Sequence, residues 1–434
     1  MLERAKGHWA ERIGVVALVA VVLAGAAYGW VELRTLLSGV TTPSALDGRP
    51  RPGGDTNILL MGLDAPHSYD ADVLMLLHVP ADGNHPTVIS IPRDDYTDLA
   101  GCPGGVCRGK IKQAYSFAFA AASKRLTASA ARDAGRAAEI ATVQQFLGGV
   151  TVDHFVEVTL AAFVEIAEVV QPITVCLTDD THDSYSGADF HRGQQQISAE
   201  QAVAFVGQRR DPQREFTDLD RERRQQAFIL SLVHQLKETP GLVGKLIPVA
   251  QGRIAVDSGL DLRALVQQAA SFELTLATLP VERFGKDSRG EDINIVDPVK
   301  IRAAAARLLG RATPPPTAGP EVDVVNGSGR EGLAARVGKV LPSRGYRAGR
   351  VSSGRRVHHT VVHYGRGDSA SAAKLVAALG GGYSVAYDGS LGAGELKLVL
   401  GGDFRELSEK DPVVPVAPPI AAEELSGDGV PCVK

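Results

Sequence analysis

The chain has few aromatic residues, few cysteines and no excess of positive charge. Phenylalanine, tryptophan and tyrosine make up 5% of its 434 residues, so the alanines that abound in its helix-like segments have to provide close packing. The formal net charge of −4 argues against bulk nucleic-acid binding, because such proteins need a basic surface. The sequence also contains no recognisable DNA-binding motif.

The four cysteines predict one disulfide and leave a second one open. Cys102 and Cys107 flank a Pro-Gly-Gly turn, and outside the membrane a short-loop disulfide is their expected state. A zinc site would need two further ligands at a suitable spacing, and none lies nearby. Cys176 lies in the strand-like run Ile173–Leu177 and is expected to be a buried thiol, with a bridge to Cys432 as the alternative.

One long uncharged run lies near the N-terminus. Ile13–Val31 carries no formal charge over 19 residues, about 28 Å as a helix, which suits a bilayer core of about 30 Å. Three basic residues precede the run and only Arg34 follows closely, so residues 1–12 are expected in the cytosol and the rest outside the cell. A cleaved signal peptide is the alternative, but the run is long for one and an uncleaved anchor is favoured.

Two proline-rich segments divide the rest of the chain. Residues 32–55 are a linker, and residues 56–310 alternate strand-like and helix-like patterns, which predicts an α/β sheet covered on both faces. Residues 311–320 are a second linker, 321–404 a small α/β unit, and 405–434 a flexible tail. The clearest predicted elements are strands at 57–62, 73–79, 88–91 and 173–177, helices at 127–147 and 160–170, and a helix that Ser198 and Gln201 start with a capping box.

The segment Val88–Leu99, VISIPRDDYTDL, places charged side chains directly after a predicted strand. Pro92 ends the strand because proline cannot donate to a sheet ladder. Arg93 then lies at a rigid strand end, where α/β sheets bind ligands, and its planar guanidinium suits phosphate oxygens. A simple ion pair between Arg93 and Asp94 is the alternative explanation.

Two aspartates lie at neighbouring strand ends. Asp64 ends one predicted strand and Asp72 begins the next, so their carboxylates can converge and hold Mg²⁺ or Mn²⁺ on a pyrophosphate. Aspartates that cap turns are the alternative. Asp70 either joins this cluster or lies in solvent.

A basic helix is predicted to open at Asp218. Arg221, Arg224 and Gln225 are spaced i, i+3 and i+4, so they share one face near a helix N-terminus, where free N–H groups favour an anion. The same face becomes apolar at Phe228, as a phosphate head beside an apolar tail requires. A core helix with a solvated basic start is the alternative.

In this order, the segments resemble the catalytic domain of the LytR-CpsA-Psr family over residues 56–310. Residues 321–404 open with a VxVxNGSG pattern and resemble the LytR C-terminal domain. The resemblance implies an α-β-α sandwich that moves a glycopolymer phosphate from a polyprenyl-pyrophosphate carrier onto peptidoglycan. The segments that carry it are Asn57–Asp64, Asp70–Val79, Val88–Leu99, Lys110–Tyr115 and Arg209–Gln226.

The resemblance also implies roles for single residues. Asp218 would orient a neighbouring arginine, and Asp94 or Asp95 would take the proton of an acceptor hydroxyl. No covalent enzyme intermediate is needed. The implied sets are Arg93, Asp94, Asp218 and Arg221 for catalysis, Lys110, Arg209, Arg224 and Gln225 for the pyrophosphate, and Asp64 and Asp72 for Mg²⁺ or Mn²⁺.

Several positions depart from the family pattern. Ala65 and Pro66 stand where an arginine is usual, Asp70 and Ala71 replace an Arg-Ser pair, and Lys112 replaces an asparagine. The missing arginines favour one alternative, a non-catalytic binder of lipid-linked wall intermediates. A polyprenyl-pyrophosphate hydrolase is another. Teichoic acid, capsule and arabinogalactan all remain as the polymer, with the Ala/Arg/Gly-rich composition favouring arabinogalactan.

Overall fold

The computed structural model describes most of the chain beyond its N-terminal segment. The predicted membrane helix at 13–31 lies outside the described residues, and none of the described helices is long and apolar enough to cross a membrane. The described residues are 41–42, 54–65, 67–102, 107–208, 210–211, 216–239, 241–242, 245, 254–257, 259–260, 274–311, 319–405, 425–426 and 429–434.

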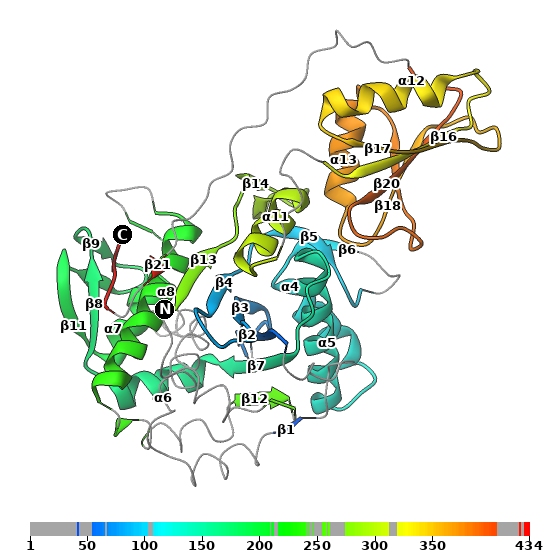
Figure 1. Ribbon diagram of the computed structural model, residues 1–434. Coiled ribbons are helices and arrows are strands. Elements are labelled where there is room, and N and C mark those ends of the chain that lie inside the picture. Colours follow the sequence, from blue (N-terminus) through cyan, green and yellow to red (C-terminus); the bar gives the residue numbers. More distant parts are fainter. Residues whose placement is uncertain are drawn as a thin grey trace.

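A mixed sheet forms the centre of the first domain (Figure 1). The central pair β2 and β3 is antiparallel, whereas β2 with β7 and β4 with β13 are parallel. Apolar residues, chiefly leucine, dominate β2 and β3, and all nine residues of β3 are buried. In spatial order the strands are β1 (Thr41–Thr42), β12 (Ile254–Asp257), β7 (His154–Thr159), β2 (Thr56–Leu63), β3 (Ala71–Val79), β4 (Thr87–Ser90), β13 (Thr275–Thr278) and β21 (Leu425–Ser426).

Helices cover both faces of this sheet, which gives three layers. Successive residues of β2 point to opposite sides, so Ile58 and Leu60 belong to one apolar core and Leu59 and Met61 to the other. The first core includes residues of α6 (Leu160–Val170), α7 (Ala199–Gly207) and α8 (Asp218–Glu238); the second includes residues of α4 (Gln113–Ala122), α5 (Ala128–Phe146) and α11 (Pro298–Leu308).

Smaller sheets surround the central one. The hairpin of β5 and β6 follows the Arg93 segment directly, and it therefore leads the chain from the end of β4 to Lys110. The smaller strands are β5 (Tyr96–Leu99), β6 (Cys107–Lys110), β8 (Ile173–Leu177), β9 (Thr181–Asp183), β10 (Ala188–Phe190), β11 (Gly193–Ile197), β14 (Arg283–Lys286), β15 (Asp292–Ile295) and β22 (Cys432–Val433).

The second domain contacts the first through the start of α13. The carboxylate of Asp98 in β5 accepts hydrogen bonds from the backbone N–H and the hydroxyl of Ser369, and Arg302 in α11 pairs with Asp368 at 2.8 Å. Figure 1 shows α13 on the side of the second domain that faces β5 and α11. Its elements are β16 (Glu321–Asn326), α12 (Leu333–Val340), η2 (Leu341–Arg344), β17 (Arg347–Ser353), β18 (Val361–Tyr364), α13 (Ser369–Ala378), β19 (Ser384–Tyr387) and β20 (Glu395–Leu400).

The end of the chain differs from the predicted flexible tail. β21 pairs with β13 and β22 pairs with β8, so the described residues beyond 424 return to the first domain. Cys432 is bonded to Cys176, and the expectation of a buried thiol at Cys176 is therefore wrong. The predicted Cys102–Cys107 disulfide is confirmed.

Candidate anion-binding active site

Arg93 lies just beyond β4, with its guanidinium among carboxylates from three elements. One terminal nitrogen, Nη1, donates to Oδ1 of Asp72, while Nε lies 3.7 Å from Oδ2 of Asp94 and 3.8 Å from Oδ2 of Asp218. Burial lowers the pKa of Arg93, but these carboxylates outweigh it and raise the pKa above its ordinary value. The guanidinium is therefore a buried, permanent positive charge at the sheet end.

The first turn of α8 adds a second guanidinium. Thr217 caps the helix, and Nη2 of Arg221 lies 2.6 Å from Oδ1 of Asp218, the carboxylate that also faces Arg93. Burial and the charge of Arg93 lower the pKa of Arg221. Although burial opposes its ionisation, Asp218 has a lowered pKa because Arg221 and Arg93 both attract its charged form. Two neighbouring guanidiniums in a buried place favour an anionic ligand.

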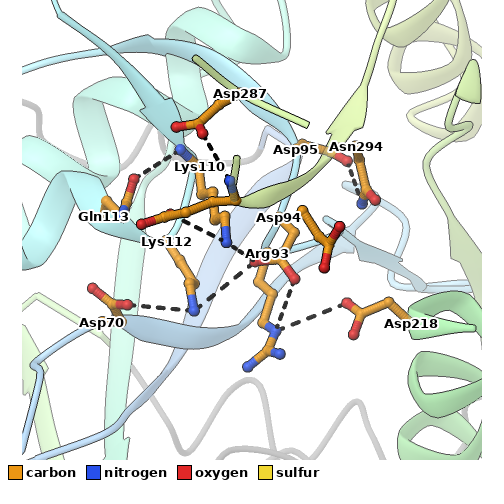
Figure 2. Close-up of polar contacts among 12 residues, drawn as sticks. Asp70, Arg93, Asp94, Asp95, Lys110, Lys112, Gln113, Asp218, Asp287 and Asn294 are labelled. Atoms are coloured by element: carbon orange, nitrogen blue, oxygen red, sulfur yellow. Dashed lines mark hydrogen bonds and ion pairs between the residues drawn. The ribbon is translucent and has the colours of Figure 1, made fainter. Parts of the chain in front are cut away.

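Two lysines complete the positive side of the cluster. Nζ of Lys110, at the end of β6, lies 3.8 Å from Oδ1 of Asp94 and 3.5 Å from Oε2 of Glu291. Nζ of Lys112 lies 3.3 Å from both Oδ2 of Asp70 and Oδ1 of Asp72. Figure 2 shows both lysines pointing toward the Arg93 and Asp94 side chains.

Several polar atoms of this cluster are buried without a hydrogen-bond partner. Native proteins contain few such atoms, and a group of them in one place marks a ligand site. The two guanidinium nitrogens can donate to phosphate oxygens, whereas the two carboxylate oxygens can accept from a hydroxyl group or face a cation. They are Nε of Arg93, Oδ1 of Asp94, Oδ2 of Asp218 and Nη1 of Arg221.

The two predicted metal ligands have different surroundings. Oδ2 of Asp64 accepts a hydrogen bond from Ser68 at 2.8 Å, while its Oδ1 is buried and accepts no hydrogen bond, so Asp64 fits a cation. Oδ1 of Asp72 already receives Arg93 and Lys112. The described residues contain no group of three or more histidine, cysteine, aspartate or glutamate side chains suited to a metal.

Arg224 and Gln225 do not join this cluster. Nη1 of Arg224 donates to Oε1 of Gln208 at 2.5 Å, and its Nε donates to the backbone oxygen of Lys434 at 2.7 Å. The amide of Gln225 donates to the backbone oxygen of Val206. Consecutive helical positions are about 100° apart, so Arg224, three positions after Arg221, is rotated by about 60° around the helix axis. It therefore faces α7 and not the cluster around Arg93. The described contacts do not support the pyrophosphate role assigned to these two residues.

Two further sequence predictions have separate outcomes. Arg209 lies outside the described residues, so its predicted role stays a prediction. Phe228 and Leu232 of α8 are buried in the apolar core that also includes residues of α6 and α7, rather than forming an apolar surface beside the site.

Two buried carboxyl groups lie beside the cluster. Asp95 accepts a hydrogen bond from the amide of Asn294 at 3.1 Å, and Glu222 follows Arg221 in α8. Burial raises the pKa of both carboxyls well above their ordinary values. The sequence interpretation named Asp95 but missed Glu222, although its i, i+4 spacing from Asp218 places the two on one helix face.

The fold and the site define an α/β domain with a buried cluster of guanidinium and carboxylate groups beyond strand β4 of its central sheet. The pattern of the LytR_cpsA_psr family matches residues 38–305, more than half of the chain, and the pattern described as LytR cell envelope-related transcriptional attenuator matches residues 320–404. The chain therefore belongs to the LytR-CpsA-Psr family, as its motifs predict.

The chain is similar to several bacterial proteins. The chain is 30% identical over 410 residues to the cell wall biosynthesis protein LcpA of Corynebacterium glutamicum, covering 84% of this chain and 78% of that protein. It is 31% identical over 170 residues to the polyisoprenyl-teichoic acid–peptidoglycan teichoic acid transferase TagU of Bacillus subtilis, covering 38% of this chain and 48% of that protein. The crystal structure of protein gbs0355 from Streptococcus agalactiae matches with a TM-score of 0.48 and 19% identity, over 60% of this chain and 90% of that one.

Proposed function

We propose that this protein is a membrane-anchored phosphotransferase that attaches a cell-wall glycopolymer to peptidoglycan. The donor is a polyprenyl-pyrophosphate-linked glycan, arabinogalactan-, teichoic acid- or capsule-like, and the product is a phosphodiester. The observation that carries the proposal is the pair of buried guanidiniums, Arg93 and Arg221, each with a buried nitrogen that makes no hydrogen bond. Support also comes from the relative TagU, whose name describes a transfer of teichoic acid to peptidoglycan.

Binding of the pyrophosphate would use charges that the fold already holds in place. Phosphoryl transfer needs positioning and charge neutralisation more than covalent chemistry by the protein. Arg93 and Arg221 donate to the non-bridging oxygens, Asp218 keeps both guanidiniums oriented, and Lys110 adds a third positive charge from the β5–β6 hairpin.

The transfer itself is a single displacement. An acceptor hydroxyl of the peptidoglycan sugar attacks the glycan-bound phosphorus, a new P–O bond forms, and the bond to the bridging oxygen breaks. The electron pair leaves with the polyprenyl phosphate. Asp94 takes the hydroxyl proton, because its Oδ1 is buried and accepts no hydrogen bond before the substrate arrives.

A divalent ion is part of the proposal. Mg²⁺ or Mn²⁺ would be held by Asp64, with Asp72 as second ligand, and would neutralise charge on the pyrophosphate and the departing phosphate. Oxygens of the donor pyrophosphate would supply further ligands to this ion. An anchor at 13–31 with residues 1–12 in the cytosol would place the site outside the cell, where peptidoglycan lies.

The first prediction concerns Arg93. The full chain in detergent is incubated with a labelled polyprenyl-pyrophosphate-linked saccharide, Mg²⁺ and peptidoglycan fragments. We expect label and phosphate on peptidoglycan with wild type, and a loss of at least 100-fold with Arg93→Ala, the size typical for one preorganised charge donor. Arg125→Ala, at an exposed position between α4 and α5, is the matched control and should keep wild-type activity.

Each other outcome has a defined meaning. Full transfer by a folded Arg93→Ala variant contradicts the site assignment. Tight donor binding by wild type without transfer supports a non-catalytic binder, and release of the glycan phosphate into solution supports a hydrolase.

A further inference from the structure

Lys112 lies at the centre of the acidic side of the site. Its Nζ is 3.3 Å from Oδ2 of Asp70, 3.3 Å from Oδ1 of Asp72 and 3.9 Å from Oδ1 of Asp94. The side chain is 11% exposed, so its ammonium is largely removed from water. Figure 2 shows the side chain pointing toward Asp70 and Asp94.

The backbone fixes this position from two sides. The N–H of Lys112 donates to the carbonyl oxygen of Arg93, and its own carbonyl oxygen accepts from the N–H of Ala71. Lys112 also directly precedes α4, whose first residue is Gln113. The ammonium is thus held relative to β3 and to the Arg93 segment, the two elements that supply the surrounding carboxylates.

Three carboxylates surround the ammonium of Lys112, and with the lysine in place the described residues form no metal site of their own. Hard oxygen ligands from several segments are what divalent ions take in proteins, and an ammonium is the compact point charge that can replace such an ion. The lysine Nζ lies within hydrogen-bond distance of Asp70 and Asp72 and at ion-pair distance from Asp94. Lys112 therefore places its own charge between the carboxylates of Asp70, Asp72 and Asp94.

An ordinary ion pair does not account for this arrangement. Asp72 and Asp94 also pair with the guanidinium of Arg93. The charge of Lys112 therefore acts on the same two carboxylates that position Arg93. Burial opposes the ionisation of Asp218, yet Lys112, after Arg221 and Arg93, helps to lower its pKa. Lys112 therefore interacts electrostatically with several carboxylates of the site and not with a single partner.

We propose that Lys112 is a built-in cation of this site, which supplies part of the positive charge that a divalent ion would otherwise provide and keeps such an ion from binding there before the donor arrives. The inference goes one step beyond the proposed function, because it concerns the same carboxylates. A neutral residue in its place opens Asp70, Asp72 and Asp94 to a divalent ion.

The test measures Mn²⁺ binding to the full chain without any donor, from the loss of the electron paramagnetic resonance signal of free Mn²⁺. We expect Lys112→Asn to bind Mn²⁺ at least tenfold more tightly than wild type. Lys112→Arg keeps the charge and should bind as weakly as wild type. Lys124→Asn removes an exposed lysine after α4 and is the matched control.

Thermal unfolding provides the second readout. Mn²⁺ should raise the midpoint of Lys112→Asn and leave that of wild type unchanged, because only the variant gains a ligand for its folded state. If Lys112→Asn does not fold, Lys112→Gln is measured by the same criteria. Equal Mn²⁺ affinity of wild type and the folded neutral variant overturns the proposal, as does tight binding by Lys112→Arg.

This result is independent of the transfer assay. Failure of transfer with a confirmed gain of Mn²⁺ binding would overturn the proposed function alone. Normal transfer with no change in Mn²⁺ binding would overturn the role of Lys112 alone.

Discussion

The carboxyl of Asp95 gives the site a pH-dependent stability. Burial raises its pKa well above the ordinary value of 3.8, so the folded protein keeps a proton that the unfolded chain loses above about pH 4. Stability contributed by this group therefore falls as the pH rises from the unfolded toward the folded pKa. Asp95→Asn removes the ionisable group and keeps an oxygen for the amide of Asn294.

We expect Asp95→Asn to be more stable than wild type at pH 8 by at least about 1 kcal/mol, since one pKa unit corresponds to about 1.4 kcal/mol. The difference should disappear near pH 4. Denaturant unfolding at several pH values measures it, with Asp82→Asn at an exposed turn as the control. A stability difference of the same size at pH 4 and pH 8 would contradict this explanation.

The positions of single residues differ in how well the sequence predicts them. The sequence placed Arg93 and Asp72 at neighbouring strand ends, and their side chains do contact each other. Arg224 could not be placed correctly from the sequence. Its spacing from Arg221 does not tell toward which neighbouring element the side chain points, and in the structure it points to Gln208. The role of Lys112 depends on three carboxylates that only the tertiary structure brings together.

At the scale of elements, two helices begin with the same N-terminal capping motif, so the effect of removing the cap can be compared between them. Ser198 starts α7 and Thr217 starts α8, each with a complete capping box. Loss of such a cap costs about 1 kcal/mol of stability. We expect Ser198→Ala and Thr217→Ala to be destabilised alike, while only Thr217→Ala lowers transfer severalfold, because α8 carries Asp218 and Arg221.

Calorimetry and the transfer assay measure the two effects. Equal activity of both variants would show that the start of α8 does not position Asp218 and Arg221. A lower activity of Ser198→Ala would show that the loss follows stability rather than the site.

Elements with a strong apolar pattern were predictable to the residue. The helix at 160–170 and the strand at 173–177 have the predicted bounds, because apolar runs and a proline mark their ends. The short strands β9, β10, β14 and β15 were missed, since three- or four-residue strands carry little periodicity. β22 was missed because its partner β8 is far away in sequence, and the two bonded cysteines have a sequence separation of 256.

At the scale of the whole molecule, Lys374 joins the two domains. Its Nζ lies 2.9 Å from both Oε2 of Glu282 and Oδ2 of Asp297 in the first domain. Lys374→Met leaves two partly buried carboxylates without this partner, and we expect a loss of about 1 kcal/mol, reduced by the partial exposure of the lysine. Thermal unfolding measures the loss, and Lys339→Met at an exposed position of α12 is the control.

The effect of Lys374→Met on the contact between the two domains can be measured separately from its effect on stability. Lys374→Met should also make the segment between the domains more sensitive to limited proteolysis than in the Lys339→Met control. Identical cleavage rates would mean that the contacts of Asp98 and Arg302 suffice to hold the domains together.

The return of the chain to the first domain changes how the second domain is connected. In topological terms the second domain is an insertion, because the chain leaves the first domain after Arg311, re-enters it at Leu425 and is covalently fastened there by Cys432. A cut in one of the two connecting segments would nick the protein without separating its pieces. A chain shortened to residue 404 would instead expose the outer edges of β13 and β8. The second domain is therefore best removed by excision between its two connections.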